Sequence, residues 1–446
     1  MPVSYFAFSM KISVSGIRGI YGQDLNLHEI SKFTRLFASS MIKSGGGCVL
    51  ARDTRPSSRI IAETATATFM EEGIDVYNLE VAPTPIVFRE SRKYDGGLVV
   101  TASHNPLEWN GLKFIIKGRG IFENELDFML NGMDISKPDK FGKLFDTVSN
   151  YKDEVVDLIR KKAHNNRPVG LDLGGGAACG YFTQLFGRLG QKFFSINDIG
   201  GLSSRGPDPT TDNLNELRKL VTSNRLDFGF AFDLDGDRLV VVNNEGEKLS
   251  ADATLLICIA SSLNLGMKKF VASLDTSLSV EKYVRQHGGS IDYSKVGEAN
   301  VVEKMLDVNA DAGGEGSSAG FIMPPFNMCR DGFLASAIIS STDRKLIEEC
   351  LRFSSQYFQI RSKIPADIVV QSKVIEKFID ILKVESSQVL TIDGVKAILD
   401  DDSWVLIRPS NTEHAIRISV ESKISKAQLL YKEMRERVQL VYDQVK

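Results

Sequence analysis

A serine and a histidine follow an apolar run in the first quarter of the chain. Residues 98–100 are typical of a buried strand, and the chain continues as Thr-Ala-Ser-His-Asn-Pro, which places Ser103 beside His104. This pair could act as a nucleophile with its base. An ordinary turn is the alternative, because serine, asparagine and proline are common turn residues. The Gly-x-Ser-x-Gly sequence of a hydrolase nucleophile elbow does not surround Ser103. We call residues 101–106 the serine loop.

Three aspartates alternate along a second segment, Asp-Leu-Asp-Gly-Asp-Arg, which we call the aspartate loop. They are Asp233, Asp235 and Asp237, and Arg238 follows. Alternate residues of an extended segment point the same way, so three carboxylates converge, and a hard cation would relieve their repulsion. An Asp-rich turn is the alternative; an EF-hand fits less well, because Arg238 and Asn244 stand where it needs glycine and glutamate. The loop predicts Mg²⁺ with open positions for a phosphorylated partner.

The tail carries a further anion-binding pattern, the arginine loop. Arg408 begins the sequence Arg-Pro-Ser-Asn-Thr-Glu, and Arg417 follows it closely. Backbone N–H groups of such turns form anion nests, and arginine binds phosphate through two hydrogen bonds. An ordinary polar hairpin is the alternative. The other candidate donors are Ser410, Asn411 and Thr412.

The remaining polar candidates have weaker patterns. Glu315 and Ser317 lie in a Gly-Gly-Glu-Gly-Ser-Ser sequence, the glycine loop, which would suit vicinal sugar hydroxyls but is equally typical of a plain turn. Arg18 lies beside a glycine in Ser-Gly-Ile-Arg-Gly, and Lys113 comes soon after the serine loop. Either charge could be an ordinary solvated one.

Three segments with one common plan would position these residues. Each has a strand with aspartate at its end, a loop of small residues, a helix closed by glycine, and a second strand. The first strands are expected at 48–53, 169–172 and 270–275. This is the order of a βαβ unit. A later strand of each copy ends in the serine, aspartate or glycine loop, and open α/β sheets bind ligands beyond such strand ends.

We therefore predict an α/β protein of four domains. Three similar α/β repeats with mixed sheets occupy 1–150, 151–255 and 256–365, and a C-terminal α+β domain occupies 366–446. A helix within 150–170 would connect the first two domains. Three such domains could direct their three loops at one cleft.

The overall composition excludes several classes of protein. The chain has 446 residues, of which 43% are hydrophobic and 25% charged, which is typical of globular proteins. A net charge of −3 provides no basic field for nucleic acid, and no apolar run approaches the ~20 residues of a membrane span. The five cysteines form no C-x-x-C pair and fit free thiols. We expect a cytoplasmic protein that starts at Met1 or Met10.

Together these motifs closely resemble the α-D-phosphohexomutase superfamily, which includes phosphoglucomutase, phosphomannomutase and phosphoglucosamine mutase. The matching segments cover nearly the whole chain in family order: SGIRG, ARDTRPSS, APTP, TASHNP, NGLKF, FDLDGDR, KVGEANVVEKM, GGEGSS and RPSNTEHAIRI. The resemblance implies four domains around a central cleft and a phosphoserine at Ser103. It also implies one Mg²⁺ held by that group with Asp233, Asp235 and Asp237.

The implied reaction interconverts hexose 1-phosphate and hexose 6-phosphate. Phosphoserine gives its phosphoryl group to the free hydroxyl, the resulting hexose 1,6-bisphosphate reorients, and its other phosphate returns to Ser103. The bisphosphate also serves as activator. Mg²⁺ offsets charge on the transferring group. The implied partners are small hexose phosphates, without nucleic acid or membrane, and the protein would be a monomer or homodimer.

The resemblance also implies roles for individual residues. Ser103 would be the phosphoryl carrier, with His104 belonging to its loop rather than to a hydrolase pair. Arg18 and Lys113 would handle a proton or stabilise charge, and Arg238 completes the catalytic group. Sugar hydroxyls would be bound by Glu315 and Ser317. The clamp for the non-reacting phosphate would consist of Arg408, Ser410, Asn411, Thr412 and Arg417.

A few positions depart from the family pattern. Leu234 stands where glycine is usual, and Ser318 and Ala319 stand where many relatives have glycine and then histidine or glycine. Glu298 occupies a position where some relatives have histidine and others aspartate, and His414 occupies one where proline is frequent. None removes a residue that phosphoryl transfer needs, but several could change the preferred sugar.

Because one clamp must hold either phosphate while the sugar reorients, it should bind the phosphate more strongly than the ring, and relaxed use of glucose and mannose phosphates is the leading expectation for the substrate. Phosphoglucosamine mutase is the alternative, because Glu298 could pair with an ammonium group. A phosphatase with an aspartyl-phosphate intermediate fits less well, since Asp233 ends a late strand of its domain and Ser103 would have no role. A sugar-phosphate-binding relative without turnover is a further alternative.

Overall fold

The computed structural model describes most of the chain, and the contacts divide it into two compact units. The first unit contains Met1–Ser250 and Ser318–Asp343, and the second contains Ala251–Ser317 and Arg344–Lys446. The described residues are 10–132, 140–160, 167–318, 320–386, 388–400, 403–410 and 414–446.

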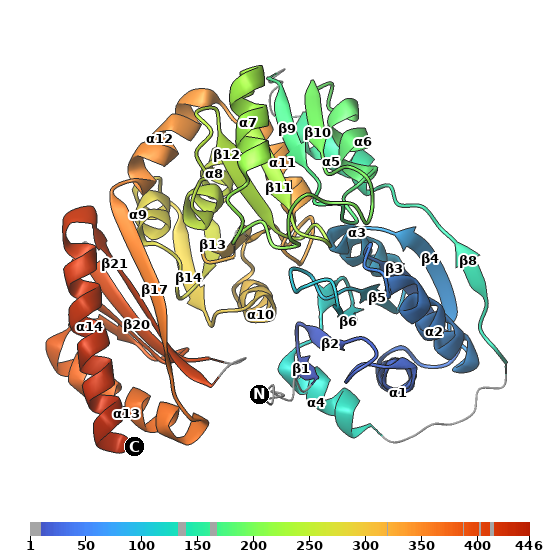
Figure 1. Cartoon of the computed structure of the whole chain (residues 1–446), viewed down its shortest axis with the longest axis horizontal. Helices are drawn as coiled ribbons and strands as arrows, with labels where there is room; N and C mark the ends of the chain where they lie inside the picture. Colours follow the sequence, from blue (N-terminus) through green and yellow to red (C-terminus); the bar gives the residue numbers. More distant parts are fainter. Residues whose placement is uncertain are drawn as a thin grey trace, which may run out of the picture. The chain divides into compact units, whose positions relative to one another are not determined.

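A sheet of eight strands carries the serine loop (Figure 1). Its centre runs in the order β4 (Asp75–Val81), β3 (Gly47–Arg52), β5 (Gly96–Val100) and β6 (Trp109–Ile116). The first three strands are parallel, and β6 is antiparallel to β5. The other strands are β1 (Lys11–Ser13), β2 (Gly16–Ile20), β7 (Arg119–Gly120) and β8 (Leu144–Asp146), and the helical segments are α1 (Leu27–Phe37), η1 (Ala38–Ile42), α2 (Ser58–Glu71), α3 (Thr84–Glu90), η2 (Ser91–Lys93) and α4 (Glu123–Asn131).

A second sheet follows the same plan and carries the aspartate loop. Its strands lie in the order β10 (Phe193–Ile196), β9 (Val169–Asp172), β11 (Phe228–Phe232) and β12 (Leu239–Asn243), again three parallel strands and an antiparallel one. The predicted connecting helix is α5 (Tyr151–Arg160). The remaining elements of the first unit are α6 (Tyr181–Arg188), α7 (Asn215–Asn224), β16 (Gly320–Ile322) and α11 (Gly332–Ser341).

The second unit contains the third repeat. Its parallel strands lie in the order β14 (Ser290–Ser294), β13 (Lys269–Ser273) and β15 (Ala312–Glu315), and the glycine loop begins within β15. The helices of this part are α8 (Ala251–Asn264), α9 (Leu278–Gln286), α10 (Glu298–Val308) and α12 (Arg344–Ser354).

The C-terminal part of the second unit is an antiparallel sheet with two long helices. The strands lie in the order β17 (Tyr357–Pro365), β21 (Ala415–Lys423), β20 (Ser403–Pro409), β19 (Val395–Asp400) and β18 (Gln388–Leu390), and the helices are α13 (Ile368–Glu385) and α14 (Ile424–Val445). Apolar residues alternate along β21, where Ile416, Ile418 and Val420 are buried in one core with residues of both helices. Alternation of apolar residues places them on one face of the strand, the face that the two helices cover.

The predicted repeat and fold class are confirmed. In all three copies the first strand lies between the second and the third. The closing glycines Gly73, Gly190 and Gly288 follow α2, α6 and α9 with φ of +76°, +72° and +72°. This left-handed conformation ends helices at glycine because other residues carry a Cβ that opposes it. The exact domain boundaries and the central cleft stay predictions.

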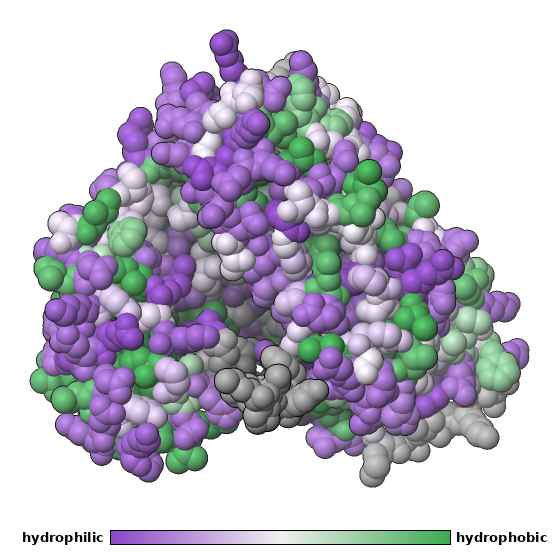
Figure 2. Space-filling model, in the orientation of Figure 1, coloured by the Kyte–Doolittle hydropathy of each residue, from purple (hydrophilic) through white to green (hydrophobic). Residues whose placement is uncertain are grey.

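The surface offers no membrane-spanning element among the helices that the structure describes. Hydrophilic side chains cover most of the face seen in Figure 2, and hydrophobic ones are scattered among them.

Candidate active site

The aspartate loop directly follows β11, and its three carboxylates are fully buried. Asp233, Asp235 and Asp237 each have 0% of their surface exposed, and one oxygen from each lies within 4.8 Å of the others. Gly236 turns the loop with φ of +71°. The three predicted carboxylates therefore converge as the alternation of residues indicates.

Each aspartate has a different hydrogen-bond partner. Ser103 Oγ donates to Asp233 Oδ2 at 2.9 Å, and Thr84 Oγ1 donates to Asp235 Oδ2 at 2.7 Å. Asp235 Oδ1 and Asp237 Oδ1 are buried and accept no hydrogen bond from the described residues. Buried acceptors of this kind are unusual in proteins unless a ligand or ion completes them. The free oxygens fit a divalent cation with oxygen ligands.

The charges around the three aspartates affect their pKa values differently. Burial raises the pKa of Asp233 and of Asp235, and neighbouring carboxylates raise both further. Burial would also raise the pKa of Asp237, but the Arg330 guanidinium and the Lys113 ammonium hold it well below its usual range. Arg330 Nη2 donates to Asp237 Oδ2 at 3.0 Å and Lys113 Nζ donates at 3.2 Å. Asp237 is therefore the aspartate most firmly kept as a carboxylate.

The serine loop presents Ser103 to this cluster from the end of β5. Ser103 is 1% exposed and has φ of +51°, in the left-handed region. Its amide donates to Thr101 Oγ1 at 2.8 Å, and its Oγ lies 3.3 Å from His104 Nδ1. The strand supplies the position, and the loop supplies the strained turn that directs the hydroxyl to Asp233.

A buried arginine holds the serine loop in this shape. Arg55 Nη2 donates to the carbonyls of Ser103 and Asn105, at 2.5 and 2.7 Å, and its Nη1 donates to Trp109 O at 3.0 Å. Asp53 Oδ2 accepts from Arg55 Nε at 3.0 Å, so the buried guanidinium is paired. Arg55 is fixed by its ion pair and in turn fixes the backbone around Ser103.

His104 lies beside the serine, and Arg238 lies beside His104. Arg238 Nη2 is 3.5 Å from His104 Nε2, and the Arg238 amide donates to Asp233 Oδ1 at 3.1 Å. Burial lowers the pKa of His104 to about 3, and the Arg238 charge acts in the same direction. His104 is therefore neutral at physiological pH, and Asp208, 3.8 Å from Arg238 Nη1, balances the arginine.

Arg18 and Lys113 approach the aspartates from adjacent strands. Arg18 on β2 pairs in register with Gly111 on β6, two residues before Lys113. Burial lowers the pKa of Arg18, while the charges of Asp235 and Asp237 raise it. The first unit thus brings together all eight residues predicted for the phosphoryl and metal groups.

Sequence reasoning missed several residues of this site. Thr84 and Arg55 stand within segments that carry the family resemblance, but neither had been given a role. Arg330 had no signal at all, because it comes from a distant segment and its single charge forms no pattern. Its contact with Asp237 depends on how residues 318–343 fold back onto the first unit.

The arginine loop brings two cations face to face in the second unit. Arg408 on β20 and Arg417 on β21 are opposite each other in the ladder, and Arg417 Nε donates to Ser410 Oγ at 3.2 Å. Like charges in opposed positions destabilise a sheet, and the Asp393 carboxylate, 3.8 Å from Arg408 Nη1, offsets one of the two. The pair therefore fits an anion-binding site. Asn411 and Thr412, also predicted here, lie outside the described residues.

Glu315 is buried at the end of β15. It is 3% exposed, and its Oε1 accepts from the Gly297 amide at 2.9 Å. Ser317 is half-buried two residues later. The contact places Glu315 next to the segment that carries Glu298, the position of the family departure.

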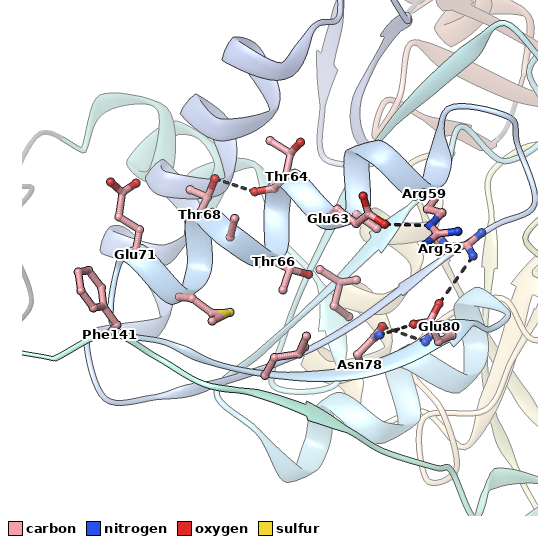
Figure 3. A pocket seen from close by; sticks show the side chains of 15 residues that line it. Arg52, Arg59, Glu63, Thr64, Thr66, Thr68, Glu71, Asn78, Glu80 and Phe141 are labelled. Carbon is pink, nitrogen blue, oxygen red and sulfur yellow. Dashed lines mark hydrogen bonds and ion pairs between the residues drawn. The ribbon is translucent and has the colours of Figure 1, made fainter.

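A separate groove of about 920 Å³ lies over α2 and the strands β3, β4 and β8 (Figure 3). Arg59 pairs with Glu63 at 2.8 Å and Arg52 with Glu80 at 3.7 Å toward one end, and Phe141 lies toward the other. None of the residues predicted for chemistry lines it. Its charged groups are already paired, so we assign it no role in the reaction.

Family models match this chain over nearly its whole length. They are the alpha/beta/alpha domains I, II and III of phosphoglucomutase/phosphomannomutase, over residues 9–129, 145–246 and 250–350, and the C-terminal domain over residues 365–438.

Individual proteins match it with similar coverage. A probable phosphoglucosamine mutase of Methanothermobacter thermautotrophicus is 32% identical over 94% of this chain and 96% of that protein. A phosphoglucosamine/phosphogalactosamine mutase of Sulfurisphaera tokodaii is 31% identical, with coverage of 92% and 94%.

Solved structures match the fold. A phosphoglucomutase/phosphomannomutase family protein of Burkholderia thailandensis has a TM-score of 0.84 at 23% identity, covering 98% of this chain and 99% of its own. An N-acetylphosphoglucosamine mutase of Aspergillus fumigatus, solved with GlcNAc-6P and magnesium, has a TM-score of 0.59 at 12% identity, covering 98% of this chain and 96% of its own.

Proposed function

The chain is a member of the α-D-phosphohexomutase superfamily, whose enzymes are isomerases that move a phosphoryl group within a hexose phosphate, and we propose that it acts on amino-sugar phosphates. The proposed reaction interconverts glucosamine 1-phosphate and glucosamine 6-phosphate. The observation that carries the phosphoryl chemistry is the 2.9 Å hydrogen bond from Ser103 to Asp233 within a buried carboxylate cluster.

Ser103 is the proposed phosphoryl carrier. Its Oγ–P bond breaks as the free sugar hydroxyl bonds to phosphorus, and one proton passes, in net terms, from that hydroxyl to Ser103 Oγ. Asp233 Oδ2 and His104 Nδ1 lie 2.9 and 3.3 Å from Oγ and would orient it, while Arg18 and Lys113 are the proposed groups for handling this proton or stabilising charge. The hexose 1,6-bisphosphate then reorients and returns its other phosphoryl group to Ser103 in the reverse of the first step.

The proposed metal is Mg²⁺, held by Asp233, Asp235 and Asp237 with the phosphoryl group of Ser103. The two unpartnered buried oxygens of Asp235 and Asp237 support this assignment. When bound, Mg²⁺ would offset negative charge on the transferring group. Lys113 already contributes positive charge from the chain itself, because it contacts Asp237.

The proposed substrate contacts belong to the second unit. Arg408, Arg417 and Ser410 would bind the phosphate that is not reacting, which agrees with the unfavourable pairing of two arginines across β20 and β21. Asn411 and Thr412 are proposed from the family motif alone. Glu315 and Ser317 would contact sugar hydroxyls in either orientation of the substrate.

The choice of amino sugar rests on the relatives. The sequence motifs favour glucose and mannose phosphates, but the relatives at about a third identity are named for phosphoglucosamine. Glu298 begins α10 immediately after Gly297, whose amide binds Glu315. A carboxylate at this point could pair with an ammonium group, so the alternative of the sequence analysis is now the better supported one.

The decisive measurement compares kcat/KM for glucosamine, glucose and mannose 1-phosphates, each with its bisphosphate as primer. We expect glucosamine 1-phosphate to be favoured by about tenfold or more, which corresponds to about 1.4 kcal/mol. Glu298→Gln should weaken the amino-sugar reaction selectively. Equal or faster turnover of glucose or mannose 1-phosphate would contradict the amino-sugar assignment and support relaxed use of glucose and mannose phosphates.

A further inference from the structure

Asp393 contacts two separate parts of the proposed substrate site, the segment before Glu298 and the guanidinium of Arg408. It lies in the turn between β18 and β19 and is 9% exposed. Its Oδ2 accepts from the Val296 amide at 3.1 Å and lies 3.8 Å from Arg408 Nη1. One carboxylate oxygen therefore faces both the backbone before Glu298 and the guanidinium of the arginine loop.

The next amide along the chain is bound from the other side. The Gly297 amide donates to Glu315 Oε1 at 2.9 Å. Two consecutive peptide groups are thus held by two carboxylates, one from the glycine loop and one from the turn beside Arg408. The result is a continuous series of contacts from Glu315 through residues 296–297 and Asp393 to Arg408.

The turn that carries Asp393 packs closely against β20. Gly394 has φ of +74°, and a Cβ there would lie 2.2 Å from Ile407 O and 2.6 Å from Arg408 Cα. The turn therefore lies directly against the strand that carries the arginine. Gly297 has φ of +124°, a conformation that side-chain-bearing residues rarely adopt. Both ends of the Asp393 contact therefore depend on a glycine at a position that a side chain would disturb.

We propose that Asp393 is a positioning residue that couples sugar binding by Glu315 to phosphate binding by Arg408. This inference rests on the proposed function, in which these two groups hold different ends of one substrate. The substrate has to bind in two orientations, with either phosphate in the arginine loop. Both orientations need the same separation between Glu315 and Arg408, and the Asp393 carboxylate maintains it.

Asp393→Asn is the direct test, because it keeps an oxygen for the Val296 amide but removes the charge that faces Arg408. We expect KM for the best hexose phosphate to rise about tenfold or more, as when one partner of a buried charge pair is lost. The thermal midpoint should stay close to that of the wild type. Asp380→Asn, on the exposed face of α13, is the matched control and should leave KM unchanged.

A double-mutant cycle with Glu315→Gln separates coupling from a merely structural effect. If Asp393 couples the two groups, the double variant should be no more than about threefold worse in kcat/KM than the poorer single variant. Full multiplication of the two losses, or a wild-type KM for Asp393→Asn, overturns the inference. Should Asp393→Asn not fold, Asp393→Glu keeps the charge and displaces it by one methylene. A raised KM then supports the proposal and a wild-type KM overturns it.

Failure of the proposed function has a different signature. If the wild type turns over no glucosamine phosphate, the amino-sugar assignment is wrong, and the cycle is measured on the hexose phosphate that it does turn over. If the wild type is active and Asp393→Asn matches the Asp380→Asn control, only the coupling is wrong.

Discussion

Ser103 combines a strained backbone with a hydroxyl that has two polar neighbours. A residue with a side chain at φ of +51° costs of order 1–3 kcal/mol, and such strain persists only where the surroundings enforce it. Here the enforced conformation directs Oγ to Asp233 and His104. Seven other described residues with side chains have a positive φ, so the direction of the Ser103 hydroxyl, rather than the strain alone, agrees with a role in chemistry.

At this scale the first prediction is that Ser103→Ala abolishes turnover. The change removes only the hydroxyl that carries the phosphoryl group, so the fold should persist. Intact-mass spectrometry of the wild type after incubation with hexose 1,6-bisphosphate should show a phosphoryl adduct that the variant lacks. Ser39→Ala, a half-buried serine elsewhere in the first unit, is the control. Near-wild-type turnover by Ser103→Ala would rule out this mechanism.

The aspartates lead to a second prediction at the same scale. Asn at position 233, 235 or 237 removes one charge from the cluster and should lower kcat by about two orders of magnitude or more. EDTA should silence the wild type, and Mg²⁺ should restore it. Asp198→Asn, on an exposed loop of the same domain, should have no effect. If metal analysis shows that EDTA has removed all the metal and the enzyme is still fully active, the proposed metal site is wrong.

At the scale of elements, the serine loop depends on a residue outside it. Arg55 donates to the carbonyls of Ser103, Asn105, Pro106 and Trp109 and pairs with Asp53. A planar guanidinium with five donors can span several carbonyls at once, and a lysine ammonium cannot. The loop conformation is therefore a property of the segment between β3 and α2 as much as of the loop itself.

Arg55→Lys should therefore weaken both fold and chemistry. We expect the free energy of unfolding to fall by about 1–3 kcal/mol, since buried carbonyls lose their donors. The kcat should fall about tenfold or more while KM changes less, because Ser103 loses its orientation rather than the substrate its contacts. Arg59→Lys, exposed on α2, provides the control. Unchanged kcat in Arg55→Lys would show that the loop keeps its shape without this network.

Much of this arrangement could be predicted from local patterns. The repeated strand, helix and glycine order predicted the three α/β repeats with mixed sheets, and the alternation of Asp233, Asp235 and Asp237 predicted their convergence. Arg330 and Asp393 could not be predicted, because each acts across a long stretch of sequence and neither lies in a periodic pattern. Their roles depend on tertiary contacts, for which one sequence carries no local signal.

At the scale of the whole molecule, both units bury charged side chains, but those of the first belong to the proposed site and two of those in the second do not. The first unit gathers the proposed phosphoryl and metal groups, and the second buries Lys396 and Glu421, each 1% exposed. Lys396 Nζ donates to Leu274 O at 2.7 Å and lies 4.2 Å from the Trp404 ring centroid. Glu421 Oε1 accepts from Trp404 Nε1 at 2.9 Å and from the Leu278 amide at 2.7 Å.

These charges should make the stability of the second unit depend on pH. Burial raises the pKa of Glu421 from 4.5 to about 7, with Asp252 acting in the same direction. Burial lowers the pKa of Lys396 from 10.5 to about 8, although Glu421 opposes this change. Between about pH 4.5 and 7 the folded chain holds a proton on Glu421 that the unfolded chain has released, so stability falls as pH rises. Between about pH 8 and 10.5 the unfolded chain holds the extra proton, on Lys396, so stability rises again.

Glu421→Gln should remove the fall between about pH 4.5 and 7, because the amide oxygen still accepts both hydrogen bonds but cannot ionise. At pH 8 the variant should be more stable than the wild type by up to about 3 kcal/mol, the equivalent of a pKa difference between 4.5 and about 7. This gain in the free energy of unfolding is an upper limit, because Lys396 also loses its favourable interaction with the Glu421 carboxylate. Urea unfolding followed by Trp404 fluorescence in a Trp109→Phe background reports on the second unit, because these are the chain's two tryptophans. Glu436→Gln, exposed on α14, is the control. If the free energy of unfolding depends on pH in the same way for Glu421→Gln and the wild type, Glu421 ionises normally in the folded chain and the prediction is wrong.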